Sequence, residues 1–269
     1  HAAMMPAAEA MAKEGAVAEG FLDWMKANVA FPNTMIDKIT PHPDAQIEAM
    51  LEKDGVEDMG VIHTEKHTVT AGFVNAEQAE YLVVEDSFPN GRPPLEKAGI
   101  LFTDKETVDK VEKMKVGTCL NPLHTALAIL GCLLGFTKIS AEMADDDLSE
   151  FVDRLGYVES LPVVQDPGVL SPKKFLDEVI KLRLPNPFLP DTPQRIATDT
   201  SQKVGVRFGE TILRYQQLNR DMNALQAVPM ALAGWMRYLL AVDDKGGPME
   251  VSSDPLKEEL QSALASVSW

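Results

Sequence analysis

The sequence of 269 residues has little cysteine, few aromatic residues, few basic residues and no long apolar run. Its two cysteines, Cys119 and Cys132, lie in apolar surroundings and lack the close pairing that redox and metal motifs require. We therefore expect both to be small buried side chains in a reducing compartment, the cytoplasm. The longest apolar stretch, from Ala126 to Phe136, is much shorter than the ~20 residues of a membrane helix, so no membrane span is expected.

Basic residues are fewer than acidic ones. The sequence has 25 Lys and Arg and 41 Asp and Glu, which gives a formal net charge of −16. Such a field repels phosphate backbones and anionic lipid, so neither nucleic acid nor a membrane is expected as a partner. Glycine-rich phosphate-binding turns are absent, since neither GxGxxG nor GxxxxGK occurs. The opening residues lack the pattern of a secretory signal, and they start with His rather than Met. We interpret the sequence as one entered partway.

The remaining composition, 45% hydrophobic and 25% charged, is that of a globular protein. A helical spacing of apolar residues predicts a first helix from Pro6 to Ala30. β-Branched runs between turn signals predict short strands and loops up to about Lys97. Beyond Lys105 the pattern predicts a mostly α remainder, with helices over Glu106 to Met114, Pro122 to Phe136, Ala141 to Leu155, Pro172 to Leu182, Gln202 to Gln217, Asn223 to Leu240 and Pro255 to Ala265.

Prolines mark several of these helices. Asn121 before Pro122 and Asp254 before Pro255 suit a helix cap followed by the first helical position. Pro229 falls inside a predicted helix, so that helix should kink or divide there. The apolar surface of the helix from Pro122 runs nearly all the way round, which predicts a central buried helix.

The most informative string is KMKVGTCLNPLHTALAILGCLLG, in which Asn121 and His124 share the first turn of a helix and two lysines precede them. An ammonium, an amide and an imidazole that converge can protonate a developing alkoxide and polarise a carbonyl. The alternative is structural: Asn121 caps the helix, His124 is a hydrogen-bonded core residue and the lysines form a solvated face. Spacing alone favours this alternative.

Two further strings carry charged or metal-binding residue types. Arg195 and Lys203 lie eight positions apart, about 80° around a helix, within reach of one anion. The alternative is a surface helix with ordinary ion pairs to acidic neighbours. His63 and His67 have a metal-like spacing, but strand-like residues follow them and no metal site is expected.

Five strings in order resemble the polyol-specific long-chain dehydrogenases, the mannitol dehydrogenase family. They are FPNTMIDKITP at Phe31 to Pro41, VVEDSFPNGRPPLE at Val83 to Glu96, LNPLHTALAILG at Leu120 to Gly131, RIATDTSQK at Arg195 to Lys203 and WMRYLLAVDDKGGPMEVSSDP at Trp235 to Pro255. The resemblance implies a multi-helical, α+β C-terminal domain similar to those of 6-phosphogluconate dehydrogenases. It also implies that the N-terminal Rossmann domain is missing, with residues 1–30 as a connecting helix and 31–269 as the substrate-binding and catalytic domain.

The resemblance implies an NAD(P)-dependent oxidoreductase without a metal, whose cofactor NAD is bound mainly by the missing domain, so that this chain alone is inactive. In the family a lysine is the general acid and base, and an asparagine and a histidine polarise the reacting oxygen. Asn121 and His124 match directly. Lys115 is assigned as the lysine, but five residues separate it from Asn121 where the family commonly has four. Either a bulge in the helix absorbs the extra residue, or Lys113 serves instead.

The resemblance assigns substrate contacts to Asp37, Arg195 and Lys203. Within the family, two strings are more similar to hexuronate reductases, and a uronate carboxylate has cationic partners in Arg195, Lys203 and Arg92. Fructuronate and D-mannonate are therefore the favoured pair of substrates. The alternatives are mannitol or another polyol, or a carbohydrate-binding module that has lost its chemistry along with its nucleotide domain.

Overall fold

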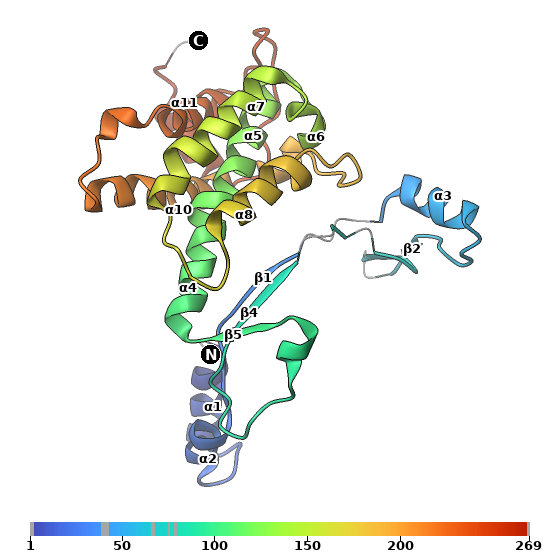
Figure 1. Cartoon of the computed structure of the whole chain (residues 1–269), viewed down its shortest axis with the longest axis vertical. Coiled ribbons are helices and arrows are strands. Elements are labelled where there is room, and N and C mark those ends of the chain that lie inside the picture. The colour runs from blue at the N-terminus through green and yellow to red at the C-terminus, as the bar shows by residue number, and fades with distance from the viewer. Residues whose placement is uncertain (1–2, 39–42, 66–67, 75, 78–79, 268–269) are drawn as a thin grey trace. The chain divides into compact units, whose positions relative to one another are not determined.

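The computed structural model describes residues 3–38, 43–65, 68–74, 76–77 and 80–267. The chain divides into two compact units, residues 1–37 with 81–111, and residues 38–80 with 112–269. The first unit holds a small sheet, two short helices near its start and most of α4 (Lys105–Lys113), and the second unit holds most of the other helices (Figure 1). The domain boundary at residues 30 and 31 stays a prediction.

The first unit is organised around a three-stranded sheet in the order β1 (Thr34–Asp37), β4 (Tyr81–Glu85), β5 (Leu101–Thr103). β4 runs antiparallel to β1 and parallel to β5, and Val83 at its centre is fully buried. A 3₁₀ turn, η1 (Leu95–Ala98), lies between β4 and β5. The described strands all fall before residue 105, which confirms the predicted strand-and-loop region.

The predicted continuous helix from Pro6 to Ala30 is wrong. The chain instead forms α1 (Met4–Lys13) and α2 (Phe21–Asn28), separated by a turn. Gly15 and Gly20 in that turn have φ angles of +70° and +80°, in the left-handed region that a residue without a Cβ adopts at little cost. The helical spacing of apolar residues continues across this turn, so the sequence pattern did not indicate that the helix ends there.

Residues 38–80 of the second unit carry α3 (Ala45–Lys53) and a short antiparallel pair, β2 (Ile62–His63) with β3 (Val69–Thr70). Asp44 begins α3 by accepting hydrogen bonds from the first turn. A buried ion pair ties this segment to the helical part of its unit: Arg183 Nε lies 2.7 Å from Glu77 Oε2. Both side chains are almost fully buried, so each charge depends on the other.

The helical part of the second unit is centred on α5 (Asn121–Leu134), and a turn before it, η2 (Met114–Cys119), continues α4 (Lys105–Lys113). The other helices and helical turns are α6 (Ile139–Glu142), α7 (Asp146–Asp153), η3 (Arg154–Ser160), η4 (Leu161–Val163), α8 (Pro172–Glu178), η5 (Val179–Arg183), α9 (Pro193–Ile196), α10 (Thr200–Gln217), η6 (Met222–Ala224), α11 (Ala227–Leu239) and α12 (Lys257–Ala263). α9, α10 and α11 pack directly against α5 (Figure 1).

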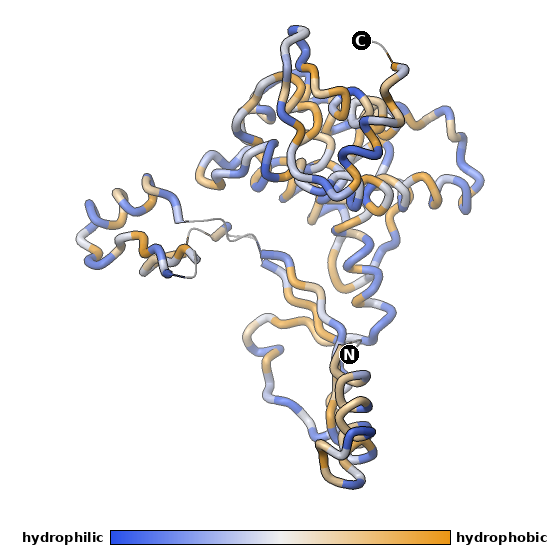
Figure 2. The backbone as a smooth tube through the Cα atoms, turned by 180° about the vertical axis from the view of Figure 1, so that it is seen from behind, coloured by the Kyte–Doolittle hydropathy of each residue, from blue (hydrophilic) through white to orange (hydrophobic). Residues whose placement is uncertain are grey.

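α5 is the buried centre that the sequence predicts. Leu123, Leu127 and Ile129 are fully buried, and most other residues of the helix are buried too. The combined helical run from Lys105 to Leu134 is long and apolar enough to cross a membrane by length and composition, but 83% of its apolar window is buried inside the protein. It therefore packs as a core helix. Figure 2 shows hydrophobic and hydrophilic stretches alternating along the helical part of the chain.

Several predicted helix ends are wrong because a distant carboxylate or a capping residue intervenes. Asp145 accepts a hydrogen bond from Leu148 N, and this cap divides the predicted helix from Ala141 to Leu155 into α6 and α7. Asp254 does not cap a helix at Pro255; its carboxylate binds Ser201 N and Thr200 Oγ1 at the start of α10. The last helix, α12, begins two residues later than expected.

α11 begins at Ala227 rather than Asn223. Pro229 therefore lies in the first turn, where its missing N–H has no helical acceptor, and the expected kink does not form. The carboxylate of Glu159 accepts hydrogen bonds from the backbone amides of Gln226, Ala227 and Val228 and so caps the helix from another part of the chain.

Candidate active site

The backbone around Lys115 contains a π-helical turn, η2, in which Leu120 N donates to Lys115 O, five residues earlier. A π turn accommodates one residue more than an α turn. In an uninterrupted α-helix the nine positions from Lys115 to His124 rotate by about 900°, which places them on opposite sides. One inserted residue changes this rotation by about 100°, so in an idealised helix the two positions would be about 80° apart rather than about 180°.

The two candidate lysines differ in their surroundings. Lys113 is exposed at the end of α4, whereas Lys115 is half-buried within the π turn. Gly117, two residues on, packs so closely against α10 that an added Cβ would lie 2.8 Å from Glu210 Cβ. The backbone therefore contains the bulge that was one of the two explanations for the extra residue between Lys115 and Asn121. The catalytic role of Lys115 stays a prediction.

Asn121 is the first residue of α5, and the residue before the helix is Leu120. No side chain makes a capping hydrogen bond at this end of the helix. Asn121 is therefore not the helix cap that the structural alternative predicted. Its carbonyl oxygen accepts a hydrogen bond of 2.8 Å from Thr125 Oγ1. The amide side chain, half-buried at the start of the buried helix, is thus placed one turn before His124.

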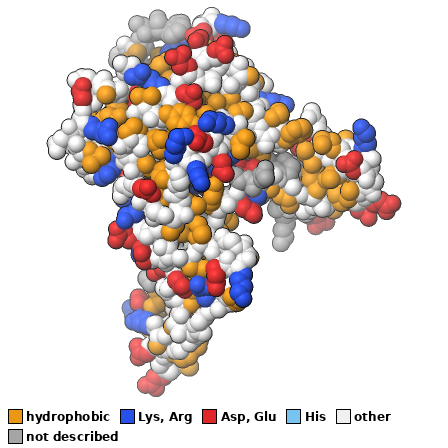
Figure 3. Space-filling view, viewed as in Figure 1, with side chains coloured by type: hydrophobic (Ala, Val, Ile, Leu, Met, Phe, Trp, Pro, Cys, Tyr) orange, Lys and Arg blue, Asp and Glu red, His pale blue; other side chains and the backbone are white. Residues whose placement is uncertain are grey.

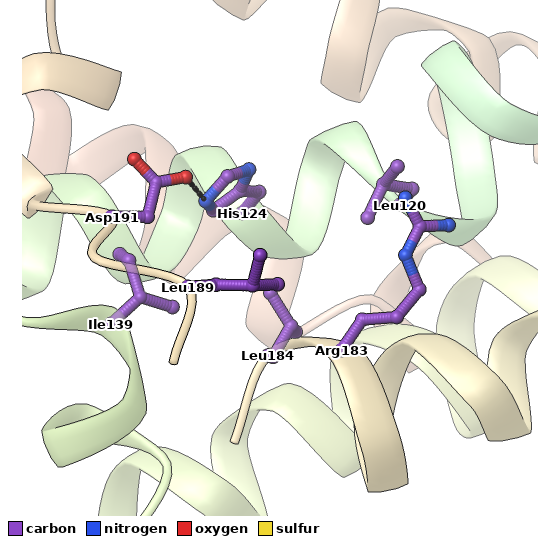
Figure 4. A pocket seen from close by; sticks show the side chains of 7 residues that line it. All are labelled: Leu120, His124, Ile139, Arg183, Leu184, Leu189 and Asp191. Atoms are coloured by element: carbon purple, nitrogen blue, oxygen red, sulfur yellow. Dashed lines mark ion pairs between the residues drawn. The ribbon is translucent and has the colours of Figure 1, made fainter. Parts of the chain in front are cut away.

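His124 is paired with a buried carboxylate that the sequence analysis did not single out. Its Nε2 lies 3.1 Å from Asp191 Oδ2, and the two side chains are only 13% and 10% exposed. Figure 4 shows Asp191 facing one ring nitrogen while the other points away from the carboxylate. A carboxylate in this position holds the imidazole in one orientation and favours the tautomer with the proton on Nε2.

Asp191 also binds Arg195. Arg195 Nε donates to Asp191 Oδ1 over 2.8 Å, and a second guanidinium nitrogen contacts the same oxygen. Burial by itself raises the pKa of the Asp191 carboxyl, but the hydrogen bonds from His124 and Arg195 outweigh it and hold that pKa below its ordinary value. The carboxylate therefore stays charged and joins two of the predicted site residues.

The local backbone fixes Asp191. Its N–H donates to Leu189 O, and its carbonyl oxygen accepts from Ile139 N. The next residue, Thr192, caps α9 by accepting from Arg195 N over 3.2 Å. The cap places Arg195 one turn after Asp191, which brings their side chains together.

Lys203 lies on α10, where its ammonium donates to the carbonyl oxygens of Ile196 and Thr198. Burial lowers the pKa of Lys203, and the charge of Arg207 and, to a smaller extent, that of Arg195 lower it further, while Asp199 and Asp254 oppose them. Arg195 and Lys203 do not share one helix, as the 80° spacing assumed, because α9 ends at Ile196 and α10 begins at Thr200. Their common contact with a substrate stays a prediction.

A pocket beside this group is lined by Leu120, His124, Ile139, Arg183, Leu184, Leu189 and Asp191 (Figure 4). Its walls are mainly apolar, and its polar groups are an imidazole, a carboxylate and a guanidinium. The cavity has a volume of about 20 Å³, room for about one water molecule, whereas small-molecule sites usually hold several hundred Å³. His124 and its partner thus border a small cavity, which is not by itself large enough for a sugar.

Asp37 and Arg92 belong to the first unit. Asp37 is fully buried at the end of β1. Arg92 donates to Asp86 Oδ1 over 2.9 Å and to Glu96 Oε2, and its guanidinium lies 3.4 Å from the centre of the Phe102 ring. The geometry shows a local structural use for Arg92, and substrate contacts of both residues stay predictions.

Sequence reasoning missed Asp191, Thr125 and Arg207. Asp191 could have been found as an acidic residue four positions before Arg195, and Arg207 as a cation four positions after Lys203. The pairing of Asp191 with His124 joins residues 67 positions apart and leaves no local signal. Of the two spaced histidines, His63 lies on β2 and His67 lies outside the described residues.

Charged side chains of both signs are mixed over the face of the molecule in Figure 3, where no extended basic surface is visible. Free Cys119 and Cys132 are both buried, and burial raises the pKa of each thiol to about 12. Both are therefore small buried side chains, as expected.

Residues 107–268 match the mannitol dehydrogenase C-terminal domain, and residues 4–97 match the mannitol dehydrogenase Rossmann domain. The chain is 54% identical to a D-mannonate oxidoreductase of Thermotoga maritima, over 97% of this chain and 49% of that protein. The chain thus spans about half the length of the curated relatives it matches.

Two solved structures share the fold. A substrate-free D-sorbitol dehydrogenase gives a TM-score of 0.75 at 28% identity, covering 92% of this chain and 48% of that one. A mannitol 2-dehydrogenase of Pseudomonas fluorescens, in a ternary complex with NAD and D-mannitol, gives a TM-score of 0.71 at 28% identity, covering 91% and 46%.

These findings correct one expectation. The Rossmann domain is not missing from the sequence, because residues 4–97 match the model of that domain. The expectation came from the five family strings, which were assigned to the C-terminal half alone, and from the absence of a GxGxxG turn. The matched residues form short strands and helices without that motif. The cofactor site can therefore no longer be assigned to a missing domain. The predicted inactivity of the chain depended on that missing domain and is no longer supported by it.

Proposed function

Because the chain belongs to the mannitol dehydrogenase family, we propose that it acts in an NAD-dependent oxidoreductase that interconverts a sugar ketone and the corresponding alcohol. The observation that carries the proposal is the junction of His124, Asp191 and Arg195 beside a pocket at the head of α5. An imidazole held by a carboxylate is suited to binding a substrate oxygen in a fixed direction. The neighbouring cations suit an oxygen-rich ligand.

The proposed substrates are fructuronate and D-mannonate. Arg195 shares Asp191 with His124, and the charges of Arg195 and Arg207 both act on Lys203, in a chain of net charge −16. A carboxylate is the sugar substituent that such cations select. The relative that is 54% identical is named a D-mannonate oxidoreductase, which supports the same choice.

In the proposed mechanism Lys115 gives a proton to the substrate oxygen in the direction of reduction and takes it back in the direction of oxidation. Asn121 donates its side-chain amide to that oxygen and stabilises its developing negative charge, which acts in the transition state rather than the ground state. His124 donates its Nε2 proton to Asp191, so its Nδ1 accepts a hydrogen bond from a substrate hydroxyl. Asp191 orients His124 and Arg195, while Arg195 and Lys203 bind the remaining substrate oxygens. When bound, the reduced nicotinamide supplies the hydride.

The residues present fit part of the cofactor. The parallel pair of β4 and β5 is the strand arrangement of a dinucleotide-binding sheet, in which ligands lie beyond the carboxyl ends of the strands. The sequence has no glycine-rich turn for the pyrophosphate. We therefore assign no single residue to the cofactor and derive only the roles of the side chains around His124.

A second candidate is a dehydrogenase of mannitol or another neutral polyol. It is supported by the relatives named mannitol 2-dehydrogenase, one of which, from Aspergillus fumigatus, is 32% identical over 89% of this chain. Here the cations would contact hydroxyl groups only.

Nicotinamide absorbance during steady-state turnover tests both candidates. The purified chain is given NADH with fructuronate or fructose, and NAD with D-mannonate or D-mannitol. The proposal expects turnover with the acid pair at least tenfold above that with the neutral pair, because charge-assisted hydrogen bonds discriminate by this amount. Faster turnover of the neutral pair selects the second candidate. Calorimetric binding of the same four sugars supplies the answer if turnover is too slow to measure, and a chain that neither binds nor converts any of them contradicts both.

A further inference from the structure

Arg207 is a half-buried cation whose one hydrogen bond given by the structure goes to a neutral oxygen. It lies on α10 and donates to Thr125 Oγ1, a neutral hydroxyl on α5 that itself donates to Asn121 O. A guanidinium carries five N–H donors in a planar fork. No carboxylate of the described residues forms an ion pair with it, although the chain has 41 acidic residues.

The charge around Arg207 makes this arrangement costly. Lys203 lies one helical turn earlier on the same side, and like charges four residues apart destabilise a helix. Burial lowers the pKa of Arg207 to about 10, which reports a cation that has lost part of its hydration. A bound anion between the two side chains would relieve both effects.

Arg207 is also close to the candidate site. Its partner Thr125 directly follows His124, and Thr125 is bonded to the backbone of Asn121. Lys203 links Arg207 to Arg195 through its charge, and Arg195 shares Asp191 with His124. Arg207 therefore belongs to the contact of α10 with the first turns of α5, the helix that carries Asn121 and His124.

We infer that Arg207 binds the carboxylate of a sugar acid, together with Lys203, and so sets the preference of this site for sugar acids over neutral sugar alcohols. This role rests on the proposed function. The planar fork of an arginine matches a carboxylate with two parallel hydrogen bonds, which a lysine cannot make. A neutral polyol has no group that uses the fork in this way.

Selectivity of binding and turnover tests the role. Arg207→Met removes the charge and keeps much of the side-chain volume, while Arg207→Lys keeps the charge and removes the fork. Arg214→Met is the matched control, because Arg214 lies on the same helix, is half-buried, and donates to neutral oxygens of Val163 and Gln217. Binding of D-mannonate and D-mannitol to each variant of the 269-residue chain is measured by calorimetry, with turnover of the same sugars and circular dichroism as a check of folding.

For Arg207→Met we expect the ratio of D-mannonate to D-mannitol affinity to fall about 10- to 100-fold, the effect of losing a charged hydrogen bond. Arg207→Lys should lose less, and Arg214→Met should keep the wild-type ratio. If Arg207→Met is poorly folded, the loss of selectivity in Arg207→Lys decides the question.

Two results would overturn the inference and can be told apart. If the wild type prefers D-mannonate and Arg207→Met keeps that preference, the carboxylate is bound elsewhere and the proposed function stands. If the wild type binds or converts only the neutral sugar, or neither sugar, the proposed substrates fail and the role of Arg207 fails with them.

Discussion

His124 Nε2 lies 3.1 Å from Asp191 Oδ2, and this contact between α5 and the segment before α9 joins two parts of the chain that are far apart in sequence. Asp191 is also the partner of Arg195, so one carboxylate positions an imidazole and a guanidinium. Its pKa is held below the ordinary carboxyl value. The pairing therefore stabilises the fold above the unfolded-state pKa, and this contribution is lost as the pH falls through the lowered folded-state pKa.

Asp191→Asn should reduce turnover about 10- to 100-fold, because an amide lacks the charge that holds the imidazole and can favour the wrong tautomer. The tautomer itself is read from the ¹⁵N chemical shifts of the His124 ring, independently of activity. We expect the Nε2–H form in the wild type and a mixture in Asp191→Asn. Asp166→Asn, at an exposed loop carboxylate, is the control and should change neither. An unchanged tautomer and turnover in Asp191→Asn would remove Asp191 from the site.

Lys115→Ala should reduce turnover about 10²- to 10⁴-fold, the range for loss of a general acid or base. Lys113→Ala, two residues earlier on the exposed end of α4, should have little effect, because Lys115 is the half-buried lysine of the π turn. The measurement is kcat for the sugar acid, with substrate affinity from calorimetry as a second value. Substrate affinity should change much less than kcat, since proton transfer acts in the transition state. A large loss of kcat in Lys113→Ala with little loss in Lys115→Ala would show that Lys113 is the proton donor.

Gly117→Ala should destabilise the fold by about 1–3 kcal/mol, because the new methyl group would lie 2.8 Å from Glu210 Cβ and push η2 away from α10. Gly205→Ala on α10 has nothing within 4 Å of the added carbon and should instead stabilise by up to about 1 kcal/mol through helix propensity. Urea denaturation of the two variants measures both effects. If the two variants change the free energy of unfolding by equal amounts in the same direction, close packing against α10 does not require glycine at position 117.

Glu142 makes stability depend on pH. Its carboxyl is fully buried between α6 and Gly131 of α5, neither oxygen has a hydrogen-bond partner among the described residues, and burial raises its pKa to about 9. A folded-state pKa above the unfolded value means that the folded protein binds the extra proton, so stability is greatest below the unfolded pKa and falls as pH rises toward 9.

We therefore expect the free energy of unfolding to fall between about pH 5 and pH 9 by up to about 1.4 kcal/mol per pH unit from this group. Glu142→Gln, which resembles the neutral acid, should flatten that slope and be more stable than the wild type at pH 8. Glu150→Gln, an exposed residue of α7, is the control and should leave the slope unchanged. Denaturant titrations at four pH values supply the data, and a wild-type slope that survives in Glu142→Gln would assign it to other groups.

The sequence by itself determined the local features. Apolar periodicity located α5 and showed that it is buried, since nearly every residue of that helix is apolar. The extra residue between Lys115 and Asn121 allowed either a bulge or a different lysine, and the choice depended on backbone hydrogen bonds that only the folded chain shows. Motif order also pointed to the family, because each motif is a contiguous string.

Tertiary structure decided everything that depends on distant partners. Glu159 starts α11 and Asp254 starts α10 from other parts of the chain, so these helix ends could not be placed by local capping rules. Asp191 reaches His124 only because α9 packs against α5, and Arg207 reaches Thr125 only because α10 does. Local signals fix which residues form a helix, whereas the partners of a buried charge are set by how the helices pack.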